Sequence, residues 1–275
     1  MNDSFNNTSN ITVSLSIVEI SVVRSSNSTA FMCFENTFCL TFSLSYINKK
    51  LILFKILLLK LLSLCYQIIP VTPFEQNCTL LWCDETMEGT LIDAGGDIGK
   101  LLAAIEKNQV KISKLLLTHG HLDHVGAAKQ LATQLSVRIE GPQKEEQFWL
   151  DMLPQQAMMF RFPPAQAFLP DRWLEQGDIV QVGNLTLEVR HCAGHTPGHV
   201  VFIHHPSKLA VVGDVLFNGG IGRTDFPRGD YQSLITAIHQ QLFTLDDDYQ
   251  FIAGHGPMST IGREKKHNPF VGKFG

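Results

Sequence analysis

The stretch "LLLTHGHLDHVGA", residues 115–127, runs from an apolar segment directly into three histidines and an aspartate. His119, His121, Asp123 and His124 lie within six consecutive positions. Imidazoles and carboxylates are costly to remove from water unless each finds a partner, so folding alone does not explain why they gather here. The cluster predicts a metal site.

The spacing of these four residues allows one loop to serve two ions. In a loop that follows a strand, His119 and His121 are two positions apart and can direct both imidazoles at a single ion. Asp123 and His124 come where the chain turns into a helix, and they can face a neighbouring point. Each ion still lacks ligands, so this interpretation requires further histidines or aspartates at the ends of other strands.

Residues of the required types follow three other expected strands, next to glycines. They are His191, His195 and His199 in "HCAGHTPGH", Asp214 in "VVGDVLF" and His255 in "FIAGHGP". Nitrogen and oxygen ligands without a thiolate suit zinc, iron or manganese. A structural zinc site is more often closed by cysteines, so the pattern favours a catalytic centre.

The segments from about residue 66 onward predict an α/β fold. Strands are expected in "QIIPVTP", "CTLLWC", "GTLIDAGGD" and "KISKLLLTH", and helices in "IGKLLAAIEKNQ", capped by Asp97, and in "HVGAAKQLATQL". The second half predicts hairpins turned at Gly183-Asn184 and Pro206-Ser207, a helix capped by Asp230 and a last strand in "YQFIAGHGP". Two strand-rich halves that each end in helices predict a four-layer αββα sandwich.

Residues 1–65 have a different composition from the rest of the chain. They contain no glycine, proline, histidine, glutamine or tryptophan, although the whole chain has 21 glycines, 12 prolines and 11 histidines. We interpret them as an extension, most simply translated upstream sequence with the real start near Leu64, and residues 66–275 as the folded domain. A disordered tail is the alternative.

The end of the extension invites a membrane interpretation. "KKLILFKILLLKLLSLCY", residues 49–66, has a basic flank and an apolar run, but Lys55 and Lys60 interrupt it. Neither part reaches the roughly 20 apolar residues of a spanning helix, so no membrane association is expected. The six cysteines form no C-x-x-C pair, which favours a reduced, cytoplasmic location.

The charge of the predicted domain excludes one class of partner. The extension carries five Lys+Arg and three Asp+Glu, so residues 66–275 have 22 − 5 = 17 basic and 26 − 3 = 23 acidic residues, a net charge of −6. Without a basic excess to contact phosphates, a nucleic-acid partner is not expected.

The sequence resembles the metallo-β-lactamase superfamily, whose H-x-H-x-D-H signature is "HGHLDH" here. Within that superfamily it is similar to the glyoxalase II group of hydroxyacylglutathione hydrolases, and most to their short single-domain bacterial form of the YcbL type. The resemblance runs from about residue 66 to 275 and includes "THGHLDH", "GHTPGH", "GDVLF", "GRTDFPRGD", "GHGP" and "HNPF".

The resemblance implies a ligand set for two divalent metal ions, zinc first, with iron or manganese as alternatives. One ion would be held by His119, His121 and His195, the second by Asp123, His124 and His255, with Asp214 bridging both. The implied activity is hydrolysis of small thioesters of the S-lactoylglutathione type by a hydroxide that bridges the ions, with catalytic roles for Asp123 and Asp214. A thiolate in place of Asp214 would have favoured a β-lactamase.

Three other functions stay open. "GRTDF" also resembles persulfide dioxygenases of the same superfamily, which use a single iron, but His255 argues for a second metal. A lactonase or another ester hydrolase is the next alternative, and a non-catalytic metal-binding scaffold the last. The helical domain that carries the glutathione contacts of full-length glyoxalase II is not recognised after "HNPF", so the thioester chemistry is better supported than the thiol carrier.

Several residues outside the ligand set have expected places. Arg223 could line the substrate entrance, while Asp225 and Arg228 could pair and shape the same loop. Asp93 is expected to hold the ligand loop through hydrogen bonds, and His199 is either a brace for the site or a structural histidine. The remaining expectations are a small buried apolar role for Cys192 and surface positions for His204, His205 and His239.

Overall fold

The computed structural model describes residues 10–15, 18–24, 29–34, 38–43 and 64–273. The chain divides into two compact units, residues 1–60 and 61–275. In the first unit, four strands form an antiparallel sheet in chain order, β1 (Asn10–Leu15), β2 (Val18–Arg24), β3 (Thr29–Phe34) and β4 (Phe38–Ser43).

The boundary predicted at residue 65 stays a prediction. Most of the segment considered as an anchor, residues 49–63, lies outside the described residues. Within the described ranges, no helix combines the length and the apolar character needed to cross a membrane.

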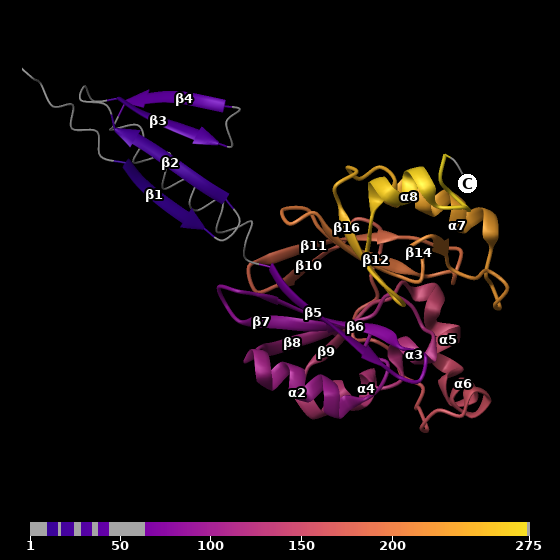
Figure 1. Ribbon diagram of the computed structural model, residues 1–275. Coiled ribbons are helices and arrows are strands. Elements are labelled where there is room, and N and C mark those ends of the chain that lie inside the picture. The colour runs from indigo at the N-terminus through magenta and orange to yellow at the C-terminus, as the bar shows by residue number, and fades with distance from the viewer. Residues whose placement is uncertain (1–9, 16–17, 25–28, 35–37, 44–63, 274–275) are drawn as a thin grey trace, which may run out of the picture. The chain divides into compact units, whose positions relative to one another are not determined.

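The first sheet of the second unit has five strands in chain order. They are β5 (Leu64–Val71), β6 (Gln76–Cys83), β7 (Glu88–Ile92), β8 (Lys111–Leu116) and β9 (Arg138–Glu140). The first three strands pair antiparallel, and β7, β8 and β9 pair parallel. Parallel neighbours need a crossover, which α2 (Ile98–Asn108) and α4 (Ala128–Leu135) provide on one face of this sheet (Figure 1).

The second sheet has six strands, β10 to β13 with β16 and β17. Its order is β10 (Ile179–Val182), β11 (Leu185–His191), β12 (Val200–His204), β13 (Leu209–Gly213), β16 (Gln250–Ala253) and β17 (Ser259–Thr260). The two predicted hairpins are present as β10–β11 and β12–β13. The chain crosses from β13 to the parallel strand β16 through α7 (Tyr231–Ala237) and a π-helical turn, and it ends in α8 (Ile261–His267).

Side chains alternate between two apolar layers along the central strands. In β8, Leu115 faces the helices of the first half while Leu116 lies between the two sheets. In β12, Phe202 lies between the sheets while Val201 and Ile203 face α7 and α8. Because successive residues of a strand point to opposite faces, a strand that is apolar at every position is covered on both sides.

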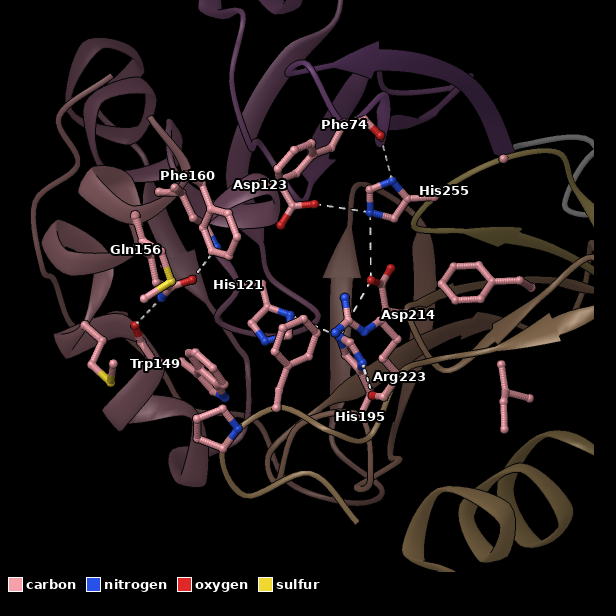
Figure 2. A pocket seen from close by; sticks show the side chains of 18 of the residues that line it. Phe74, His121, Asp123, Trp149, Gln156, Phe160, His195, Asp214, Arg223 and His255 are labelled. Atoms are coloured by element: carbon pink, nitrogen blue, oxygen red, sulfur yellow. Dashed lines mark hydrogen bonds and ion pairs between the residues drawn. The ribbon is translucent and has the colours of Figure 1, made fainter. Parts of the chain in front are cut away.

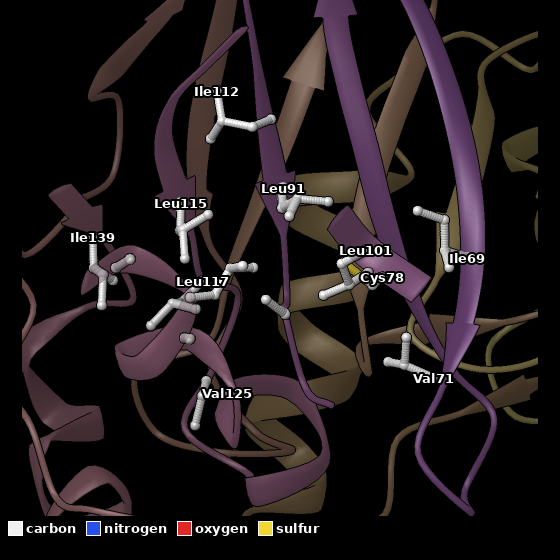
Figure 3. Close-up of a cluster of buried hydrophobic side chains, with 14 of the residues drawn as sticks. Ile69, Val71, Cys78, Leu91, Leu101, Ile112, Leu115, Leu117, Val125 and Ile139 are labelled. Atoms are coloured by element: carbon white, nitrogen blue, oxygen red, sulfur yellow. The ribbon is translucent and has the colours of Figure 1, made fainter. Parts of the chain in front are cut away.

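Three clusters of buried hydrophobic side chains follow from this alternation. One lies between the first sheet and its helices (Figure 3), one between the sheets, and one between the second sheet and its helices. Three apolar interfaces separate four layers, so the predicted αββα sandwich is confirmed.

Two local predictions were wrong in detail. The helix predicted after His124 is broken into α3 (Leu122–Val125) and α4, because the N–H of Ala127 donates to the carbonyl of Ala94 instead of continuing the helix. Asp97 does stand at the start of α2, but its backbone is left-handed and its side chain makes no cap. Its carboxylate instead accepts a hydrogen bond from the N–H of Thr72 and pairs with Lys100.

Candidate metal centre

Four loops, each following a strand, bring the predicted ligands together. His119, His121, Asp123 and His124 follow β8, His195 follows β11, Asp214 follows β13 and His255 follows β16. Figure 2 shows several of these side chains converging from separate elements. The approach is close: a Cβ built on Gly254 would lie 2.0 Å from Oδ1 of Asp214, so a glycine is needed where β16 passes the carboxylate.

The first group consists of three buried imidazoles. Nδ1 of His121 lies 3.1 Å from Nε2 of His119 and 3.0 Å from Nε2 of His195, so three ring nitrogens face one point. Burial lowers the pKa of His119 and of His121 well below the usual value for histidine. A neutral imidazole is the form that binds a metal ion.

The second group joins a carboxylate to two imidazoles. Oδ2 of Asp123 lies 3.2 Å from Nε2 of His255 and 3.8 Å from Nε2 of His124. Atoms of these three residues lie within 4.8 Å of one another, as do those of the first group. Two imidazoles and one carboxylate form a typical set of nitrogen and oxygen ligands for a divalent transition metal.

The carboxylate of Asp214 lies between the two groups. Its Oδ1 is 3.4 Å from Nε2 of His124, and its Oδ2 is 3.6 Å from Nε2 of His195 and 3.8 Å from Nε2 of His255. Burial alone would raise the pKa of Asp214, but the facing imidazoles, led by His124, outweigh it and hold this pKa below the usual value. The residue is therefore placed to serve both groups as a carboxylate.

Two of the converging atoms lack the partners that buried polar atoms normally have. Nε2 of His124 and Oδ1 of Asp214 have no hydrogen bond within the described part of the chain, although both are buried. Most buried polar atoms in proteins are hydrogen-bonded. Unpaired lone pairs that face one another fit a bound cation, so the residues present suit the predicted pair of metal ions.

The opposite ring nitrogens of three candidate ligands are anchored. Nδ1 of His124 lies 3.0 Å from Oδ2 of Asp93, Nδ1 of His195 lies 2.7 Å from the Arg223 carbonyl, and Nδ1 of His255 lies 3.0 Å from the Phe74 carbonyl. An N–H donated to such an acceptor leaves the lone pair of Nε2 directed at the centre.

Asp93 has the role that the sequence predicted. Its carboxylate accepts hydrogen bonds from the N–H and the hydroxyl of Thr118, at 2.7 and 2.6 Å, besides facing His124. It therefore fixes both the start of the ligand loop and the orientation of one candidate ligand.

The Asp93→Ala variant is expected to bind one of the two predicted metal ions about tenfold to a hundredfold more weakly, because His124 loses the acceptor that orients it. Competition with a zinc-binding indicator measures both affinities. Asp97→Ala is the matched control, since this exposed aspartate contacts Lys100 rather than a ligand. Two unchanged affinities in the Asp93 variant would contradict this role.

His199 braces the centre, which decides the alternative that the sequence left open. Its ring stacks on that of His119 at 4.6 Å between centroids, and its Nε2 accepts the N–H of Asp214 at 3.1 Å. His191 instead contacts the Pro197 carbonyl and does not join either group of imidazoles. Cys192 is buried as predicted, and burial raises the pKa of its thiol to about 12.

Two surface predictions were wrong. His204 is buried at the end of β12, where the strand is covered on both faces, and its Nδ1 contacts the Ser207 hydroxyl. Asp225 pairs with Arg223 at 2.8 Å rather than with Arg228, whose guanidinium instead lies 3.6 Å from the carboxylate of Glu145. His205 and His239 are exposed as predicted.

Glu146 is a residue of the site that the sequence did not indicate. Its buried carboxylate accepts the N–H of Gly120 at 2.8 Å and the N–H of Gly198 at 2.7 Å, and so links the loop of His119 and His121 to the loop of His195. Burial raises the pKa of Glu146 to about 7. Its position in the polar stretch "PQKEEQ" gave no signal of this role.

A cavity of about 760 Å³ opens over the centre. Arg223 lines it, as predicted, together with His121, Asp123, Asp214 and His255. The candidate ligands therefore face a space large enough for a small organic substrate.

Comparison with known proteins supports the interpretation drawn from this geometry. Residues 71–255 match the model of the metallo-beta-lactamase superfamily. The chain belongs to the metallo-β-lactamase superfamily, which confirms the resemblance seen in the sequence. It is 52% identical to the hydroxyacylglutathione hydrolase GloC of Haemophilus influenzae over 206 residues, which are 74% of this chain and 97% of that protein.

Two solved structures are similar to this chain over about three quarters of its length. The B3 metallo-β-lactamase BLEG-1 is 32% identical, with a TM-score of 0.70 over 75% of this chain and 99% of that one. TTHA1623 in a di-iron-bound form is 31% identical, with a TM-score of 0.68 over 74% of this chain and 100% of that one.

Proposed function

We propose that this chain is a metal-dependent hydrolase that cleaves small thioesters of the hydroxyacylglutathione type. The observation that carries the proposal is the carboxylate of Asp214, which lies within 3.8 Å of imidazoles from both ligand groups. The 52% identity to a relative named hydroxyacylglutathione hydrolase supports the choice of substrate.

The ligand roles follow the two groups of side chains. His119, His121 and His195 would hold one divalent ion, and Asp123, His124 and His255 the other, with Asp214 shared between them. The donor set of nitrogen and oxygen suits zinc, which we propose as the ion, with iron or manganese as alternatives. The similar protein TTHA1623 is described in a di-iron-bound form.

Two bound ions would supply a hydroxide at neutral pH, because a cation lowers the pKa of bound water from about 15.7 to about 7, and a Lewis acid for the thioester carbonyl. Asp123 would orient the attacking hydroxide by accepting a hydrogen bond from it. Arg223, at the cavity rim, would contact the substrate. The thiol departs readily as a thiolate, since its pKa is only about 8.5.

Hydrolysis of S-lactoylglutathione by the full chain, loaded separately with zinc, iron and manganese, tests this proposal. We expect turnover of about 1 to 1,000 per second in at least one metal form, abolished by a chelator and restored by the ion. Two bound ions with no hydrolysis of any thioester would contradict the proposal.

The same preparations test the alternatives. β-Lactam hydrolysis is a second candidate, favoured by the 32% identity to a B3 metallo-β-lactamase. Oxygen consumption that depends on a persulfide and on one iron per chain would indicate a dioxygenase, and activity on lactones alone would indicate a lactonase. We propose a cytoplasmic location, where such small thioesters would be the substrates.

A further inference from the structure

The cavity over the metal centre is lined mainly by apolar side chains. Its floor carries the candidate ligands, and its sides carry aromatic and sulfur-containing residues (Figure 2). Five of them lie on one side, around α5 (Gln147–Asp151), α6 (Leu153–Phe160) and the turn after β5, and we call them the apolar wall: Phe74, Trp149, Met152, Met159 and Phe160.

Except for Trp149, which is buried, the side chains of the apolar wall are exposed to solvent to an unusual degree. Met159 is 74% exposed, Phe74 47% and Phe160 43%, although large apolar side chains are normally stabilised by burial. The rings of Phe74 and Phe160 pack edge to face, with centroids 6.0 Å apart, so the two elements form one continuous surface. Methionine side chains adapt readily to different apolar partners.

The wall is continuous with the metal centre. The carbonyl of Phe74 lies 3.0 Å from Nδ1 of His255, and the indole of Trp149 packs against the His121 ring at 4.6 Å between centroids. A molecule that reacts at the centre can therefore place one of its arms beside these side chains.

The charges around the cavity do not match a strongly anionic arm. Among the described residues that line it, Arg223 is the only lysine or arginine, and it already pairs with Asp225 at 2.8 Å. Away from the metal centre, an arm with two carboxylates would find one shared cation, whereas an apolar arm would cover exposed methionine and phenylalanine.

We propose that the apolar wall binds an apolar arm of the thioester, either its acyl chain or its thiol portion, and that the enzyme prefers thioesters with such an arm to the small polar lactoyl ester. This inference rests on the proposed thioester hydrolysis and names its substrate class. Binding the arm removes water from both surfaces, so kcat/KM rises with the apolar length of the arm.

Two series of thioesters test the proposal with the metal-loaded full chain. The first keeps glutathione and varies the acyl group from acetyl through butanoyl and hexanoyl to octanoyl. The second keeps the lactoyl group and varies the thiol from ethanethiol through butanethiol to hexanethiol. We expect kcat/KM to rise about two- to fourfold per added methylene in one series, the upper value corresponding to about 0.8 kcal/mol for a fully buried methylene.

The series that rises identifies which arm meets the wall. If neither rises, the proposal is overturned, while hydrolysis of all the esters at similar rates leaves the thioesterase function standing. If no thioester is cleaved at all, the proposed function fails first and this inference fails with it.

The Met159→Gln variant tests whether the rise of kcat/KM per methylene comes from contact with the apolar wall. Glutamine keeps the length and the helical preference of methionine and removes its apolar character. We expect the rise per methylene to fall to less than about half of its wild-type value. Met158→Gln is the matched control: Met158 is 83% exposed on the same helix and is not among the residues that line the cavity. A rise that both variants leave unchanged would overturn the proposal.

Discussion

The Asp214→Ala variant is expected to retain about one metal ion per chain in place of two, and to lose about a hundredfold to a thousandfold or more of its kcat/KM for S-lactoylglutathione. The reason is geometric. The two carboxylate oxygens face different groups, Oδ1 toward His124 and Oδ2 toward His195 and His255. Removing one side chain would therefore take a ligand from both of the proposed ions at once.

Metal content by elemental analysis and rate by thioester hydrolysis measure the two effects separately. Asp248→Ala is the control, because this exposed aspartate pairs with Lys208 away from the cavity. Thermal unfolding of the metal-free variant checks that it folds. Two ions per chain in a folded Asp214→Ala protein would remove Asp214 from the bridging role.

The convergence of the candidate ligands was predictable because their signals are local. His119, His121, Asp123 and His124 follow one apolar strand within six positions, and the other candidates each follow a strand of their own. Strand ends at one edge of a sandwich meet in space, so a pattern of apolar run, glycine and histidine is sufficient to bring them together. The layers were predictable for the same reason, since continuous apolar strands must be covered on both faces.

The supporting residues were not predictable to the same degree, because their partners are distant in the chain. Glu146 accepts N–H groups from residues 26 and 52 positions away, and nothing near it in the sequence indicates that it is buried. His204 was predicted to lie at the surface. The burial of that position is set by the sheet and helices that cover β12, which no local pattern reports.

A second large effect is expected from Glu146→Gln, in the pH dependence of stability. The folded-state pKa of Glu146 is about 7, against 4.5 for an ordinary glutamate, because burial penalises the charged form. The folded protein then binds this proton more tightly than the unfolded chain does. The contribution of this proton to the free energy of unfolding is fully present below about pH 4.5 and is lost as the pH rises through about 7.

The Gln variant has no such titration, so the free energy of unfolding of the metal-free wild type should fall relative to it between pH 5 and pH 8. One pKa unit corresponds to about 1.4 kcal/mol, which sets the expected change at about 2–3 kcal/mol. The measurement is chemical denaturation of both proteins at several pH values. Glu145→Gln, a change at the exposed neighbour, is the control that should follow the wild type.

The comparison isolates the carboxyl from everything else that titrates at the centre. The buried histidines are present in both proteins, so their protonation cancels in the difference. The amide of glutamine presents one oxygen to two N–H donors, those of Gly120 and Gly198, and this mismatch costs about 1–2 kcal/mol. That cost does not depend on pH. The protonation of Glu146 is therefore seen only in how the difference in free energy of unfolding between the two proteins changes with pH. A difference that stays constant from pH 5 to pH 8 would mean that Glu146 remains charged between the two ligand loops.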